Sequence, residues 1–255
     1  LNGGAGKDTF TMAGNLTYQD DVDGGAGVDT VTVSAAQEDI NFMNVSNVEV
    51  LSIDAGGNTS NTLSAYFTAS GTGTVITDPD NVSTITATGT TAGVTYQVRG
   101  TGQNESITAG TGDDTIDVNG TAVLNGTDVL NGGDGADTIL VNNSAGAVTI
   151  APDQDNVTKI ENIVVKDADG GDTAGAENAD AISITMGGVN NDSVDRTDVA
   201  MAIDASVITD TNDVATISAA SVADPDYVFT ITGGAAADSL TGGAGTDTIS
   251  GGGGA

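Results

Sequence analysis

The chain contains no cysteine, no histidine and no tryptophan, and aromatic residues make up 3% of its 255 residues. Without cysteine there are no disulfides and no thiol nucleophiles. Without histidine there is no Ser-His-Asp triad and no HExxH zinc site. The Gly-x-Ser-x-Gly elbow of the α/β-hydrolases is also absent. Carboxylate pairs for glycoside hydrolysis remain open, but the scarcity of aromatic platforms argues against a sugar-cleaving site. These absences predict that the protein is not an enzyme.

Positive charge is equally scarce, with 5 Lys and Arg against 36 Asp and Glu, for a formal net charge of −31. Such a chain repels phosphate groups, which argues against a nucleic-acid partner. It also repels an anionic membrane surface unless calcium bridges the two. No apolar run is long enough to predict a transmembrane helix. Acidity with few aromatics can indicate disorder, but the abundant apolar residues alternate in strand-like blocks, which predicts a folded chain.

Glycine, in contrast, is abundant, and much of it lies in one recurring motif: Gly-Gly-x-Gly-x-Asp, with an apolar residue two places later. Glycine adopts positive φ without steric cost, so the motif predicts tight turns with exposed backbone carbonyls. Carbonyl and carboxylate oxygens are the ligands that Ca²⁺ prefers. Five stretches fit or nearly fit the motif: GGAGKDTF (3–10), GGAGVDTV (24–31), AGTGDDTI (109–116), GGDGADTI (132–139) and GGAGTDTI (242–249).

Three acidic pairs are spaced nine residues apart: Glu105/Asp114, Asp128/Asp137 and Asp238/Asp247. A nine-residue period is typical of calcium-binding parallel β-roll repeats. Stacked turns bring like charges together, and two carboxylates ~4 Å apart repel by roughly 4 kcal/mol at an effective dielectric near 20. The stack therefore needs a cation to stay closed. The apolar residue after each Asp is expected to point inward, which applies to Phe10, Val31, Ile116, Ile139, Leu240 and Ile249.

With these motifs the chain resembles the RTX family of secreted bacterial proteins, whose repeat reads GGxGxDxUx with U apolar. The resemblance implies that Asp side chains and turn carbonyls ligate Ca²⁺ between coils. It also implies export by type I secretion and folding in external calcium. The implied metal ligands are Asp8, Asp29, Asp114, Asp137, Asp238 and Asp247, with Glu105 and Asp128 in weaker repeats and the turn glycines Gly4, Gly6, Gly25, Gly27, Gly133, Gly135, Gly243 and Gly245.

Two further acidic stretches are candidates. Asp21 or Asp23 is a candidate to complete the site of the repeat that follows them. The stretch DADGGD (167–172) is either another calcium loop or a solvated acidic loop. The Asp-Pro-Asp stretch at 78–80 is interpreted as a turn rather than an acid/base pair.

A larger repeat is also visible, because VITDPDNVSTITA (75–87) aligns with VITDTNDVATISA (207–219). It predicts two RTX-flanked β-solenoid units, 1–119 and 120–255, with an insertion of about twenty residues within 167–206. The Thr/Val-rich blocks between the glycine repeats read as short strands, and 198–208 is the nearest candidate for a helix. The predicted fold is all-β: calcium-binding parallel β-roll or β-solenoid repeats that flank Thr/Val-rich β-blocks.

The expected function is that of a calcium-dependent structural segment of a secreted protein at the bacterial cell surface. The blocks resemble S-layer and other surface-matrix proteins of the RTX class, which implies self-association with copies of the same chain. A cell-surface polysaccharide is a further candidate partner. Two alternatives stay open: the stalk of a giant RTX adhesin, and the repeat region of a secreted RTX hydrolase or toxin.

Overall fold

The computed structural model describes residues 1–12, 16–69, 73–78, 80–99, 104–119, 128–143, 148–150, 157–167, 181–186, 199–223 and 225–254. Residues 168–172 of the DADGGD stretch, with Asp169 and Asp172, lie outside these residues, as does Asp224. The chain divides into two compact units: residues 1–116 with 129–137, and residues 117–128 with 138–255.

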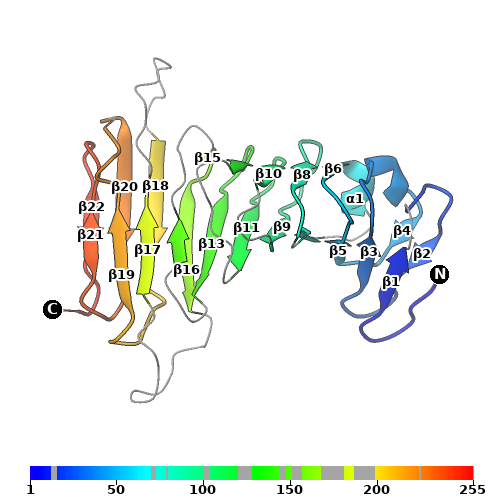
Figure 1. Ribbon diagram of the computed structural model, residues 1–255, viewed down its shortest axis with the longest axis horizontal. Helices are drawn as coiled ribbons and strands as arrows, with labels where there is room; N and C mark the ends of the chain where they lie inside the picture. The colour runs from blue at the N-terminus through cyan, green and yellow to red at the C-terminus, as the bar shows by residue number, and fades with distance from the viewer. Residues whose placement is uncertain are drawn as a thin grey trace. The chain divides into compact units, whose positions relative to one another are not determined.

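Unit 1 is a parallel β-solenoid in which short strands from successive coils form parallel sheets (Figure 1). Its first sheet follows the order β1, β3, β5, β7, β9, β11, and its second the order β6, β8, β10, β12. A two-stranded sheet joins β2 and β4 near the amino terminus. The bounds are β1 Thr9–Met12, β2 Val22–Asp23, β3 Thr30–Val33, β4 Val45–Ser46, β5 Val50–Ile53, β6 Thr59–Thr62, β7 Thr74–Ile76, β8 Ser83–Thr86, β9 Thr95–Val98, β10 Ser106–Thr108, β11 Thr115–Asn119 and β12 Val129–Asn131.

Unit 2 has the same architecture, with longer strands. One sheet follows the order β13, β16, β18, β20, β22, the other the order β14, β17, β19, β21, and each pairing is parallel (Figure 1). The bounds are β13 Thr138–Asn143, β14 Val148–Ile150, β15 Val157–Thr158, β16 Asn162–Asp167, β17 Ala181–Thr185, β18 Val199–Asp204, β19 Val214–Ser218, β20 Tyr227–Thr232, β21 Ser239–Thr241 and β22 Thr248–Ser250. The predicted all-β parallel solenoid is thus confirmed.

The core of each unit consists of apolar side chains stacked in register from coil to coil. In unit 1, β1, β3, β5, β7 and β9 pair so that Val31 follows Phe10 and precedes Leu51 in one column. In unit 2 the column runs through isoleucines that are fully buried up to Ile231. Burying an Ile or Leu side chain contributes about 1.5–3 kcal/mol, so these columns are a main source of stability.

The inward prediction is confirmed for Val31, Ile116 and Ile139, which are at most 1% exposed. Ile249 pairs in register with the buried Ile231 and continues the same column, with 47% of its surface exposed in β22.

Two short helices interrupt the strands of unit 1: the 3₁₀-helix η1 (Asp39–Phe42) and α1 (Ala65–Ala69). Phe42 and Phe67 join them edge to face, with ring centroids 5.4 Å apart. Asp39 Oδ1 accepts hydrogen bonds from the backbone N–H groups of Ser64 (2.7 Å) and Phe67 (3.0 Å), which caps α1. The nearest helix candidate in the sequence, 198–208, instead contains β18, because its alternating side chains fit a strand in register with β20.

Candidate calcium sites

The nine-residue spacing corresponds to half a coil. Glu105 immediately precedes β10 of the second sheet of unit 1, and Asp114 immediately precedes β11 of the first. In unit 2, Asp238 and Asp247 likewise immediately precede β21 and β22, in different sheets. In each pair of acids nine residues apart, one acid thus precedes a strand of the first sheet and the other precedes a strand of the second sheet. Asp128 and Asp137 hold the same positions before β12 and β13.

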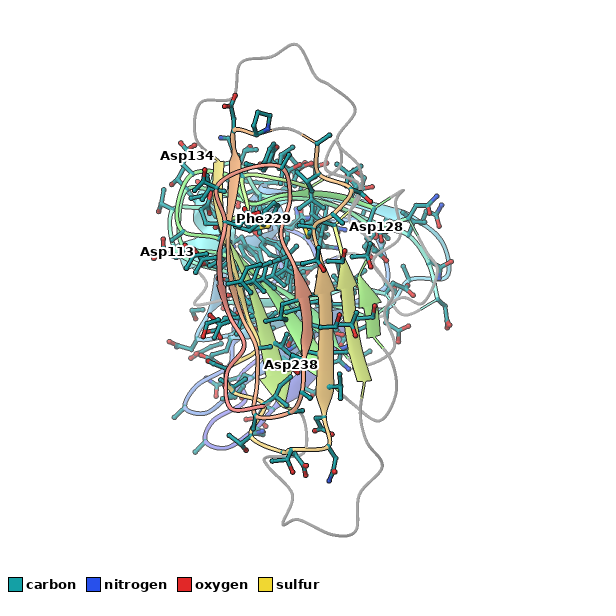
Figure 2. The ribbon with its side chains drawn as sticks, turned by 90° about the vertical axis from the view of Figure 1, so that its left-hand side faces the viewer. Asp113, Asp128, Asp134, Phe229 and Asp238 are labelled. Carbon is teal, nitrogen blue, oxygen red and sulfur yellow. The ribbon has the colours of Figure 1, made fainter. Side chains whose placement is uncertain are left out.

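Most of these acids, and Asp29 as well, accept a hydrogen bond from the backbone of the preceding coil. Asp29 Oδ1 accepts one from Asp8 N–H at 2.8 Å, and Asp137 Oδ1 accepts one from Asp114 N–H at 2.7 Å. The bond recurs along the solenoid. Asp114 Oδ1 accepts from Val94 (2.7 Å), Glu105 Oε2 from Ser83 (2.9 Å), Asp238 Oδ1 from Ala215 (2.8 Å) and Asp247 Oδ1 from Phe229 (2.9 Å; Phe229 is labelled in Figure 2).

Most of these carboxylates are buried. Asp29, Asp114 and Asp137 are at most 1% exposed, while Asp8, Asp238 and Asp247 are partly exposed. The other two predicted acids, Glu105 and Asp128, are 2% and 3% exposed. Burying a carboxylate is costly unless a partner offsets its charge. Bound cations would therefore stabilise the rows of carboxylates that lie just before the strands of each sheet.

The clearest cradle lies between the first two glycine repeats. Oδ2 of Asp8 and Oδ2 of Asp29 are buried and accept no hydrogen bond. A Cβ on Gly3 would lie 2.7 Å from Asp8 Oδ2 and 2.5 Å from the carbonyl oxygen of Gly24. The Asp8 carboxylate oxygen and the Gly24 carbonyl oxygen thus both lie beside the space that a side chain at Gly3 would fill. Ca²⁺ binds oxygen ligands of this kind at 2.3–2.6 Å, and bound there it would offset the buried negative charge.

The turn glycines adopt the conformation that the motif predicts. Gly4, Gly6, Gly25 and Gly27 have φ between 94° and 150°. A Cβ on Gly25 would overlap the carbonyl oxygen of Gly4, one coil earlier. Gly133 and Gly135, with φ of 100° and 145°, approach the carbonyl oxygens of Gly110 and Gly112 in the same way. The turns therefore stack carbonyl groups coil on coil.

The C-terminal repeat differs, because Gly243 and Gly245 do not have positive φ. In the neighbouring half-coil, Asp238 uses Oδ2 to accept the N–H of Gly234 at 2.7 Å within its own turn. Asp114 Oδ2 accepts Gly110 N–H at 3.2 Å in the same manner. At these two acids the second carboxylate oxygen is held by the turn itself, unlike at Asp8 and Asp29.

Asp114 is the acid whose titration is most clearly perturbed. Burial raises its pKa to about 6, and the neighbouring Asp137 and Asp113 add to the rise, while the N–H groups of Val94 and Gly110 oppose it. Asp113 and Asp134, both exposed, project from the same side of unit 1 (Figure 2). Asp113 Oδ1 accepts the N–H of Ala136 at 2.9 Å. The turns at 109–114 and 132–137 therefore concentrate negative charge that a cation would relieve.

The candidates before the second repeat have other contacts. Asp23 Oδ2 accepts from the side-chain amide of Asn2 (3.2 Å), and Oδ1 accepts from that of Asn47 (2.8 Å). The backbone carbonyl of Asp21 accepts a hydrogen bond from the backbone nitrogen of Leu1 at 2.5 Å. Asp78 at the Asp-Pro-Asp stretch is a turn former, since its Oδ1 accepts the N–H groups of Asp80 (2.8 Å) and Asn81 (3.1 Å).

One acid at this register was missed by the sequence motif. Glu49 immediately precedes β5, and its Oε2 accepts the N–H of Asp29 at 2.8 Å, as Asp29 does for Asp8. Its coil, NVSNVEVLSI (44–53), contains no glycine. A shorter pattern could have found Glu49: an acidic residue followed two positions later by a buried apolar residue. Glu49 and Leu51 share this pattern with Asp29 and Val31.

Within the residues that the structure covers, no group of three or more Asp or Glu side chains is gathered closely enough to hold a metal alone. Carboxylates from neighbouring coils with backbone carbonyls would have to supply the ligands. None of the helices in the described part of the chain is long and apolar enough to cross a membrane.

Comparison with known families supports this interpretation. Residues 99–120, 124–143 and 230–255 match the family of the RTX calcium-binding nonapeptide repeat (four copies). No curated protein and no solved structure matches the chain. The chain is thus a parallel β-solenoid that carries RTX repeats, and Ca²⁺ is the ion that such repeats bind. The turns at 3–8 and 24–29 lie outside the matched segments, yet they have the same positive-φ glycines as the matched turn at 132–137.

Proposed function

We propose that this chain is a calcium-gated structural segment of a secreted bacterial surface protein, and that it acts by assembly rather than catalysis. The observation that carries the proposal is the stacking of Asp8 and Asp29 on successive coils, each with a buried Oδ2 that accepts no hydrogen bond. With 5 basic residues against 36 acidic ones, the chain has too few cationic side chains to neutralise such stacks. A divalent cation from outside must do so.

The calcium affinity of such sites determines where the chain would fold. Extracellular calcium modules bind with dissociation constants of about 10⁻⁴–10⁻³ M. A chain of this affinity folds outside the cell, where calcium is millimolar, and stays open in the calcium-poor cytoplasm. We assign the ligands to Asp8, Asp29, Asp114 and Asp137 with their turn carbonyls, and to Glu105, Asp128, Asp238 and Asp247 at the other sheet entries.

Assembly would follow from the same charge. At a net charge of −31, copies repel one another until Ca²⁺ lowers the charge and bridges acidic surfaces. Self-association would build an S-layer, a filament or a surface matrix, with cell-surface polysaccharide as a candidate anchor. A solenoid suits this role because each coil contacts only its neighbours, so the fold extends by repetition.

Light scattering and electron microscopy across a calcium titration test the proposal. We expect ordered particles or sheets to form at millimolar calcium. Magnesium at the same ionic strength should be far less effective, because Mg²⁺ demands strict octahedral geometry and retains its water. A chain that folds in calcium but stays monomeric would contradict the assembly role.

The extensible coil stack also favours one other function, the stalk of a calcium-dependent adhesin. A monomeric, calcium-rigidified chain joined to a domain that binds a glycan or receptor would support the stalk. Hydrolytic or toxic activity of an attached domain would instead identify these coils as the repeat region of a secreted enzyme or toxin.

A further inference from the structure

The column of carboxylates in unit 1 extends one coil past the last N-terminal glycine repeat. The strand pairings of β1, β3 and β5 align Thr9, Thr30 and Val50. The residues immediately before them, Asp8, Asp29 and Glu49, therefore occupy one position on three successive coils. In the next coil this position belongs to Gly73, whose N–H bonds the backbone carbonyl of Glu49 at 3.1 Å. The column of acids thus ends at Glu49.

The contacts around Asp29 repeat those around Asp8. At the first coil, Asp8 Oδ2 and the carbonyl oxygen of Gly24 both face Gly3. At the second coil, Asp29 Oδ2 and the carbonyl oxygen of Asn47 both face Gly24, and a Cβ there would lie 2.7 Å from Asp29 Oδ2. Asn47 thus takes the place that Gly24 holds one coil earlier.

The backbone of Asn47 explains how a coil without glycine can do this. Asn47 has φ of 52°, a left-handed conformation that asparagine tolerates better than most residues. Its side chain is held by Asp23 Oδ1 at 2.8 Å.

The Asp29 carboxylate gives independent evidence that a cation binds here. Its side chain is 0% exposed, and its Oδ2 accepts no hydrogen bond. Its Oδ1 is already used by the N–H of Asp8. A fully buried carboxylate with an unpaired oxygen beside a carbonyl is costly unless that oxygen binds a cation.

We infer that a second calcium site lies between the repeat at 24–29 and the glycine-free coil at 44–53. Its ligands are Asp29 Oδ2 and the Asn47 carbonyl oxygen, and Glu49 supplies the second carboxylate. This inference rests on the proposed calcium dependence and adds a site that the repeat pattern does not contain. The site couples the glycine turns to the first Thr/Val-rich block, so calcium would order coils on both sides of the junction.

Calcium titration of the full 255-residue chain by calorimetry and equilibrium dialysis tests the inference. Glu49→Gln keeps an acceptor for the N–H of Asp29 and removes the charge. We expect one Ca²⁺ to bind at least tenfold more weakly, because ligand charge sets the affinity of such sites. Asp8→Asn should also weaken one ion, and Asp29→Asn two, because Asp29 lies between both sites. Glu38→Gln, an identical change at an exposed position of unit 1, should weaken none.

A second measurement does not depend on a variant folding. In the folded, calcium-loaded wild-type chain, the ¹³C carbonyl resonance of Asn47 should shift when Sr²⁺ replaces Ca²⁺ if this oxygen is a ligand, because the fold stays formed while the bound ion changes. An unmoved resonance, or a Glu49→Gln chain that binds every ion as tightly as wild type, would overturn the inference and leave the proposed function intact. Equal losses in Glu38→Gln would also overturn it. A wild-type chain that binds no calcium at all would overturn the proposed function itself.

Discussion

The backbone N–H of Asp8 donates a 2.8 Å hydrogen bond to Oδ1 of Asp29, which lies one coil further along the chain. The bond fixes the register between two coils and turns Oδ2 of Asp29 toward Gly24. The Asp29 side chain therefore holds two coils together through Oδ1 and offers Oδ2 as a cation ligand. Metal binding and folding should accordingly be coupled.

Removing calcium should unfold most of the chain. A site at 100 times its dissociation constant contributes about 2.7 kcal/mol, and a typical domain is stable by about 5–15 kcal/mol. Loss of several sites would therefore remove most of the stability. Circular dichroism in excess chelator should show loss of β-structure that returns with calcium. An unchanged spectrum and melting temperature would show that the stacked side chains hold the fold alone.

Single acids should differ according to their place in the coil. Asp137→Ala and Asp247→Ala should each lose bound calcium and destabilise the local coil, because each carboxylate also accepts a backbone N–H from the preceding coil. Asp80→Ala is the matched control, since Asp80 is exposed and contributes its backbone N–H to a turn. Calorimetric calcium counts would separate them. Equal losses for Asp80 and Asp247 would mean that the nine-residue period does not mark the sites.

Much of this architecture could be predicted because each repeat carries its own turn and its own acid. The glycines fix the turn locally, and the acid and apolar residue follow at constant spacing, so the buried positions of Asp114 and Asp137 could be read from the motif. Glu49 could not, because its coil reaches the same position through the left-handed Asn47 rather than through glycine.

Another difference comes from a neighbour that the local pattern does not contain. Val199–Asp204, within the helix candidate at 198–208, form β18 in register with β20, so tertiary pairing overrides the local pattern there. Gly243 and Gly245 fit the motif but lack positive φ, and nothing in the structure explains this difference.

A graded set of glycine variants should separate backbone strain from crowding. Gly57→Ala, where nothing lies within 4 Å and φ is ordinary, should change the free energy of unfolding little. Gly4→Ala meets no neighbour but has φ of 94°, so it should cost about 1–2 kcal/mol. Gly25→Ala adds overlap with Gly4 and should cost more than Gly4→Ala. Urea denaturation in saturating calcium measures the series, and equal costs for Gly25 and Gly57 would contradict the stacked-turn geometry.

The elevated pKa of Asp114 predicts opposite pH dependences with and without calcium. In the metal-free fold its pKa is about 6, above the ordinary value of about 3.9. The folded chain therefore holds this proton more tightly than the unfolded chain does. Stability from this group is full below pH 4 and is lost as the pH rises to 6. The loss by pH 7 is about 3 kcal/mol. With calcium present, protons compete with the metal for the carboxylate, so acidification from pH 7 to 5 should release the ion and lower stability.

The metal-free protein should be prepared by dialysis, because chelators bind calcium more weakly in acid. Melting temperatures of calcium-loaded wild type and Asp114→Asn at pH 5, 6 and 7 test the slope with calcium. Because the metal-free chain is expected to be largely unfolded near neutral pH, its slope is tested by circular dichroism, as the β-structure that each metal-free chain regains when the pH is lowered from 7 to 4. The difference between the two chains isolates Asp114 from the other carboxylates, and a difference that does not vary with pH would show that Asp114 titrates normally.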